Sequence, residues 1–141
     1  MLVRPIVVTT SDEQRLRDLI QRMRDSGPLE PQQAEAIDRL EEELARAKVV
    51  YPDQVPDNVV TMNTVVRVRA EHSRRTSEWM VVYPEDADFD EGRISILDPL
   101  GTALLGYHEG DEFEWEMRAG LRRYRVEQVV SQPEASGDYD R

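Results

Sequence analysis

Apolar residues near the amino terminus recur with the period of an α-helix. In residues 11–24 they are Leu16, Leu19, Ile20 and Met23. Steps of three and four positions place these side chains on one face of a helix. Ser11 and Gln14 stand three positions apart just before this stripe, which is a capping-box sequence. We therefore predict a helix that begins at Ser11.

A second helical segment follows a turn. Residues 25–31 contain one glycine and two prolines, which interrupt a helix. Beyond the turn, the apolar residues spaced as the seam of a coiled coil are Ile37, Leu40, Leu44 and Ala47. We predict that this helix starts near Gln32 and that residues 1–50 form a short antiparallel helical hairpin. At 1.5 Å per residue, its helices would be about 20 and 26 Å long.

The period changes from that of a helix to that of a strand after residues 51–58, a linker that contains two prolines. Apolar and polar positions alternate, as in strands, within residues 66–70, 79–83, 112–117 and 122–130. The last two segments carry a row of glutamates and a row of arginines that can face each other across a hairpin. We expect an antiparallel sheet.

Residues 94–106 combine a strand with a short, sharply bounded helix. Asp98 can cap the amino end of this helix, and Pro99 suits the first helical position, where no N–H donor is needed. Gly106 can adopt the left-handed conformation that ends a helix. The predicted fold class is α+β: a two-helix coiled-coil hairpin in residues 1–50, then an antiparallel β domain with a short helix in residues 51–141.

Several short sequences in the second part resemble one known family. They are residues 59–63, 82–84, 92–95, 94–106, 110–111, Trp115 and 132–139. In the same order, they resemble the nucleoside diphosphate kinase regulator (Rnk) family, a short relative of the bacterial Gre transcript-cleavage factors. The resemblance covers residues 50–141 strongly, and the first fifty residues only as a helical hairpin. It implies a Gre-like carboxyl-terminal domain with an FKBP-like fold.

The resemblance also implies a function. In the Gre factors the carboxyl-terminal domain holds the rim of the secondary channel of RNA polymerase, and the hairpin enters that channel. The expected protein is therefore a non-enzymatic transcription regulator that binds RNA polymerase near this channel, competes with Gre factors and influences nucleoside diphosphate kinase levels. The matching docking positions are Asp98, Pro99, Leu100 and Gly101. Capping and packing explain these residues equally well.

Two alternatives stay open. The first is a magnesium-dependent transcript-cleavage and elongation factor, because Gre factors hold a catalytic Mg²⁺ with acidic residues at the hairpin tip. The tip of this chain offers Asp25 and Glu30, with Gly27 and Pro28 between them, so the acidic Gre motif is absent. The second alternative is an FKBP-like protein-interaction module unrelated to transcription.

Composition narrows the classes of partner. Eighteen basic and 29 acidic residues give a net charge of −11, which repels a phosphate backbone. We therefore expect a protein partner and no direct sequence-specific binding to nucleic acid. The chain has no cysteine, no glycine-rich phosphate loop and no nucleophile motif, so we expect no cofactor, no metal site and no enzymatic activity. Because no apolar run approaches the ~20 residues of a membrane span, we expect a cytoplasmic protein without a membrane partner.

Overall fold

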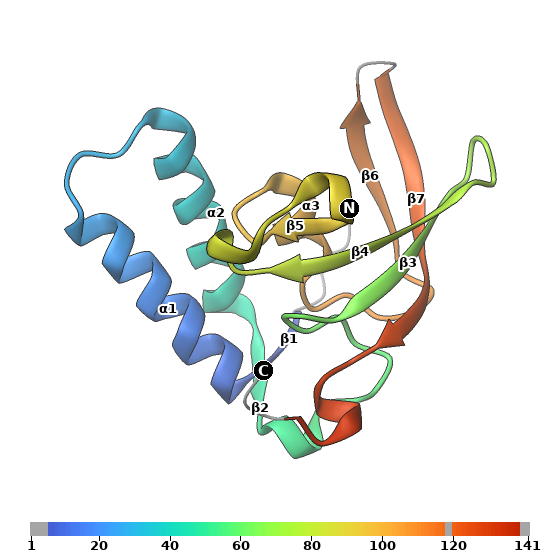
Figure 1. The fold of residues 1–141 in the computed structure, drawn as a ribbon, viewed down its shortest axis with the longest axis horizontal. Helices are drawn as coiled ribbons and strands as arrows, with labels where there is room; N and C mark the ends of the chain where they lie inside the picture. The colour runs from blue at the N-terminus through green and yellow to red at the C-terminus, as the bar shows by residue number, and fades with distance from the viewer. Residues whose placement is uncertain (1–5, 118–119, 139–141) are drawn as a thin grey trace.

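The structure, a computed structural model, describes residues 6–117 and 120–138 and has the α+β fold that the sequence predicts (Figure 1). The helices are α1 (Thr10–Asp25), α2 (Pro31–Arg46) and α3 (Pro99–Leu104). The strands are β1 (Val7–Thr9), β2 (Lys48–Val50), β3 (Val65–Ala70), β4 (Thr76–Val82), β5 (Arg93–Ser95), β6 (Glu112–Met117) and β7 (Gly120–Ser131). Within these ranges, no helix combines the length and the apolar character that crossing a bilayer requires.

The two amino-terminal helices form an antiparallel hairpin, as predicted (Figure 1). The prediction that α1 begins at Ser11 is wrong, because Thr9 is the cap: its Oγ1 accepts the N–H of Asp12 at 3.1 Å. The chain is still extended at Thr9, as the last residue of β1, and enters the helix directly afterwards. Gln14, the expected partner of Ser11, instead donates to Asp18 at 3.0 Å.

A short parallel pair of strands closes the base of the hairpin. Val7–Thr9 of β1 pairs with Lys48–Val50 of β2. The sequence did not predict β2, because three residues are too few to show an alternation and the pairing joins segments about forty positions apart. This pair fixes the two ends of the hairpin side by side.

The larger sheet has the strand order β5-β4-β3-β7-β6. Its strands are antiparallel except for β5, which runs parallel to β4. This departs from the expected fully antiparallel sheet, because residues 84–91 contain two single helical turns that carry the chain back before β5 begins. The predicted facing of glutamates and arginines is confirmed: Glu112 lies opposite Arg125, and Glu114 lies opposite Arg123. Part of the turn between β6 and β7, residues 118–119, lies outside the described residues.

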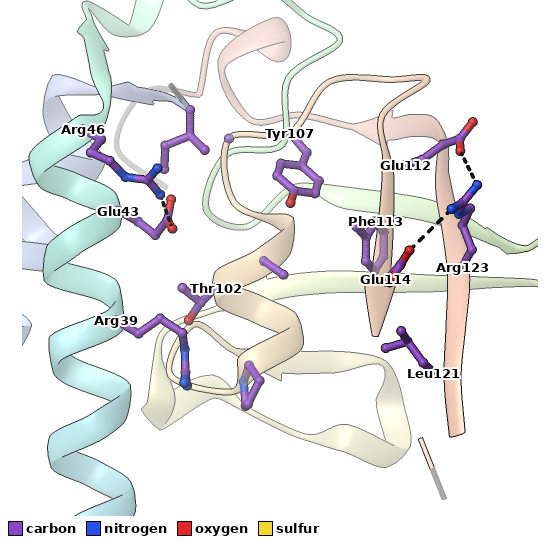
Figure 2. A pocket seen from close by; sticks show the side chains of 14 residues that line it. Arg39, Glu43, Arg46, Thr102, Tyr107, Glu112, Phe113, Glu114, Leu121 and Arg123 are labelled. Atoms are coloured by element: carbon purple, nitrogen blue, oxygen red, sulfur yellow. Dashed lines mark hydrogen bonds and ion pairs between the residues drawn. The ribbon is translucent and has the colours of Figure 1, made fainter. Parts of the chain in front are cut away.

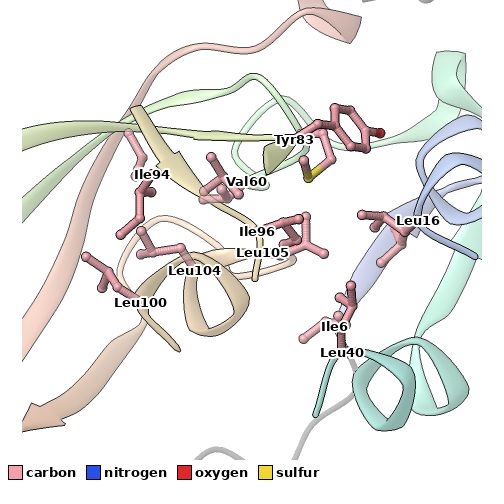
Figure 3. Packing of buried hydrophobic residues seen from close by; sticks show 14 of the residues in the cluster. Ile6, Leu16, Leu40, Val60, Tyr83, Ile94, Ile96, Leu100, Leu104 and Leu105 are labelled. Atoms are coloured by element: carbon pink, nitrogen blue, oxygen red, sulfur yellow. The ribbon is translucent and has the colours of Figure 1, made fainter. Parts of the chain in front are cut away.

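One continuous hydrophobic core joins the hairpin to the sheet and to α3 (Figure 3). Leu16 and Leu40 of the hairpin lie near Ile6. Leu105 lies between this group and Leu104 of α3. The predicted seam residues Ile37, Leu40 and Leu44 are at most 2% exposed. The hairpin therefore packs on the rest of the protein along its base. The boundary between residues 1–50 and 51–141 stays a prediction.

Candidate functional site

The amino end of α3 is formed as the sequence predicts. Asp98 is extended and caps the helix, with Oδ1 accepting the N–H of Leu100 at 2.9 Å. Pro99 occupies the first helical position. Gly106, just after the helix, has φ +82°, in the left-handed region that favours glycine. A cap, a proline and a glycine thus set the limits of a helix of only six residues.

The four residues expected to contact a partner differ sharply in exposure. Leu100 and Gly101 are buried, Asp98 is half-buried and Pro99 is exposed. A Cβ atom on Gly101 would lie 2.1 Å from the carbonyl oxygen of Ser95. Helix α3 therefore packs directly on the end of β5, and only glycine permits this approach. Leu100 and Gly101 hold the helix in place, while Asp98 and Pro99 reach the surface.

A cleft of about 730 Å³ opens beside α3 (Figure 2). Helix α2 forms one wall, the β6–β7 hairpin forms the other, and α3 with the turn after it lies between them. The residues that line it are Ile6, Arg39, Glu43, Arg46, Pro99, Thr102, Ala103, Gly106, Tyr107, Glu112, Phe113, Glu114, Leu121 and Arg123. Pro99 therefore belongs to the cleft, and the predicted docking helix and the hairpin share one concave surface.

Most charges in the cleft are already paired. Arg46 contacts Glu43 at 2.6 Å, and Arg123 contacts Glu114 at 3.4 Å. Arg39 differs: among the residues that the structure describes, no acceptor reaches its buried Nε. Leu121 adds an apolar side chain that is 60% exposed. Arg39 and Leu121 thus line the same cleft, which the sequence did not reveal because the two residues lie about eighty positions apart.

The acidic residues of the hairpin tip serve the helix ends. Asp25, the last residue of α1, accepts a hydrogen bond from Gln21 at 2.9 Å. Glu30 caps α2, and its N–H donates to Gln33 at 3.1 Å. Across residues 6–117 and 120–138, no group of three carboxylate or imidazole side chains is placed to hold a metal ion. A functional role of the tip stays a prediction.

Two of the short sequences that carry the family resemblance meet in space. The side-chain amide of Gln132 donates to the carbonyl oxygens of Pro56 and Val59, both at 2.8 Å. Nearby, the hydroxyl of Thr61 donates to Glu134 at 2.6 Å. These contacts therefore join the segment after the hairpin to the segment after β7.

Comparisons with known proteins give the family. Residues 55–131 match the family model for transcription elongation factor GreA/GreB, C-term, and residues 4–50 match that of the Rnk N-terminus. Over 103 residues, 72% of this chain and 76% of the relative, the sequence is 37% identical to the regulator of nucleoside diphosphate kinase of Escherichia coli K12. Over 127 residues, 87% of this chain and 80% of the relative, it is 31% identical to transcription elongation factor GreA of Verminephrobacter eiseniae.

A solved structure agrees with these relatives. The prokaryotic transcription elongation factor GreA/GreB from Nitrosomonas europaea superimposes with a TM-score of 0.74 at 41% identity. The match covers 89% of this chain and 99% of that one, so it includes both the hairpin and the sheet. The chain therefore belongs to the Gre-related family of nucleoside diphosphate kinase regulators, with an Rnk amino terminus and a GreA/GreB carboxyl-terminal domain.

Proposed function

We propose that this protein is a non-enzymatic regulator of transcription that binds RNA polymerase near the secondary channel and competes there with Gre cleavage factors. The observation that carries the proposal is the amino end of α3, where a cap and a close packing contact hold Pro99 rigidly at the surface. A rigid, exposed element suits a docking surface, because little conformational entropy is lost when it binds. The GreA/GreB match of residues 55–131 supports this partner.

The proposed docking surface consists of Asp98, Pro99 and the cleft beside them. Leu100 and Gly101 are buried, so a partner cannot reach them without moving α3. They support the docking surface by holding the helix in place. Leu121 supplies exposed apolar area, and Arg39 brings a positive charge to the α2 wall of the cleft. Arginine is over-represented among the residues that contribute most to the binding energy of protein interfaces.

The hairpin supports a regulator more than a cleavage factor. Each of its helices has 16 residues, which corresponds to about 24 Å at 1.5 Å per residue. Asp25 and Glu30 are engaged at the ends of these helices. Competition for the channel entrance would alter transcription, including the output that sets nucleoside diphosphate kinase levels.

A pull-down of core RNA polymerase tests the proposal, with and without a competing Gre factor. We expect capture of polymerase by this protein and release when the Gre factor is added. Pro99→Ala should weaken capture about tenfold, equivalent to about 1.4 kcal/mol. Pro31→Ala is the matched control, because Pro31 is also an exposed proline at the first position of a helix. Equal capture by wild type and Pro99→Ala would reject α3 as the docking element.

A further inference from the structure

One carboxyl group of the hairpin is buried at its junction with the rest of the protein. Asp12 lies in the first turn of α1, and its side chain is only 2% exposed. Its Oδ2 accepts the backbone N–H of Met62 at 3.0 Å, across fifty positions of sequence. Asp12 thus forms a direct hydrogen bond between the hairpin and the loop that precedes β3.

In this loop, residues 60–64, the four N–H groups other than that of Met62 have acceptors outside the hairpin. The N–H groups of Val60, Thr61, Asn63 and Thr64 donate to Tyr107 O, Thr64 Oγ1, Val81 O and Thr61 O. The N–H of Met62 is the one that points to the hairpin, and Asp12 accepts it. Because Met62 is fully buried, loss of this acceptor would leave a polar group unsatisfied inside the core.

Among the described residues, three charged or titratable groups face Asp12 from the elements around it. Arg15 lies one turn further along α1, with its guanidinium 5.9 Å from the ring centre of Tyr83, which follows β4. Glu134 approaches from the segment after β7, where it accepts a hydrogen bond from Thr61. Burial raises the pKa of Asp12 to about 7 and the charge of Glu134 adds to this, against the opposing effects of the Met62 hydrogen bond and Arg15.

We propose that Asp12 is a positioning residue: its buried carboxyl group holds the hairpin against loop 60–64, and loss of its proton weakens this attachment. The neutral group can accept the Met62 N–H without the cost of burying a charge. This attachment of the hairpin to the sheet does not depend on the identity of the partner.

The direction of the proton effect follows from linkage. When the junction opens, water reaches Asp12 and its pKa returns toward the ordinary value of 3.8, so the closed junction binds the proton more tightly than the open one. Raising the pH therefore favours the open junction, by at most about tenfold per pH unit between the two pKa values. Above the pKa of the closed state, the effect of this group is constant.

Amide hydrogen exchange at Met62, measured by NMR in the full chain and corrected for the intrinsic pH dependence, tests the proposal. In the wild type, we expect protection of this amide to fall as the pH rises from 5 to 7. Asp12→Asn keeps an acceptor but cannot ionise, so its protection should be high and independent of pH. Asp12→Ala removes the acceptor and should lose protection at every pH. The control Asp18→Asn, at an exposed position of the same helix, should behave as the wild type.

A second measurement follows the position of the hairpin itself. Since the chain has no cysteine, Gln32→Cys and Asp90→Cys can carry spin labels at exposed positions on α2 and on the segment between β4 and β5. We expect the distance distribution between the labels to broaden above pH 7 in the wild type and to stay narrow with Asp12→Asn. Met62 protection that is independent of pH in the wild type, or an equal pH slope in Asp12→Asn, would overturn the proposal.

Discussion

Asp98 and Asp12 are both acidic residues at the start of a helix, yet they have opposite surroundings. Asp98 is half-exposed and accepts the N–H of Leu100 within its own helix. Asp12 is buried and accepts an N–H from a distant loop. The sequence predicts the first role, because a cap followed by proline is a local pattern. It cannot predict the second role, because Asp12 looks the same as any exposed acidic residue in a first turn.

The cap at α3 leads to a prediction about stability. Asp98→Ala should lower the free energy of unfolding by about 1 kcal/mol, because Leu100 loses the acceptor of its N–H. Asp98→Ser should retain most of the stability, since serine is also a good cap. Urea unfolding measures both. If Asp98→Ala left the midpoint unchanged, the stabilising role of the cap would be rejected, and a loss of polymerase binding would then come from direct contact alone.

The buried carboxyl of Asp12 leads to a prediction about pH. Burial raises its pKa to about 7 in the folded protein, compared with 3.8 as the ordinary value. The folded state therefore binds more protons than the unfolded state between these values, and this contribution to stability is lost as the pH rises through them. The slope approaches about 1.4 kcal/mol per pH unit.

Urea unfolding of the wild type and of Asp12→Asn at a series of pH values from 4 to 8 measures this contribution. We expect the difference in stability between the two proteins to change in favour of Asp12→Asn as the pH rises, and to level off above pH 7. A difference that stays constant over the whole range would show that Asp12 has an ordinary pKa in the folded protein.

At the scale of elements, the structures that the sequence predicted are those set by local periodicity. The stripes of α1 and α2, the facing charges of β6 and β7, and both ends of α3 all follow from residues close together in the chain. The elements that it did not predict depend on distant pairing. Strand β2 exists because β1 lies beside it, and β5 is parallel because residues 84–91 return the chain to the same end of the sheet.

The predicted parts, residues 1–50 and 51–141, share one hydrophobic core, so each loses packing contacts when it is separated from the other. A fragment of residues 51–141 should still bind RNA polymerase, because it contains Asp98, Pro99 and Leu121, but more weakly than the whole chain, because it lacks the α2 wall of the cleft. It should also unfold at lower urea concentration, because Leu105 and Ile96 lose their cover from Leu16 and Leu40. The fragment 1–50 should not bind. Binding by 1–50 and not by 51–141 would place the docking surface on the hairpin.

At the scale of the whole molecule, the net charge of −11 bears on the kind of partner. An acidic surface favours approach to a basic protein surface and disfavours phosphate backbones. The composition could predict this preference, but it could not predict the cleft, which forms only when α2, α3 and the β6–β7 hairpin come together (Figure 2). The hairpin therefore contributes both a wall of the cleft and a tip that extends away from the sheet (Figure 1).

The alternative function, transcript cleavage, leads to the last prediction. In a backtracked polymerase complex with Mg²⁺, this protein alone should not stimulate shortening of the transcript, because hairpin helices of about 24 Å are short and the tip lacks the acidic Gre motif. Added to a reaction that contains a Gre factor, it should inhibit shortening, since both would occupy one entrance. Gel analysis of transcript length measures both effects.

The double variant Asp25→Ala/Glu30→Ala is the control that separates the two functions. If the protein is a competitor that docks through α3, the double variant should inhibit the Gre factor as well as the wild type does, because both carboxylates lie at the tip and away from the docking helix. If instead the wild type alone shortens the transcript and the double variant does not, the two carboxylates act together at the polymerase active site. That result would make Asp25 and Glu30 ligands of a catalytic metal ion and the protein a cleavage factor.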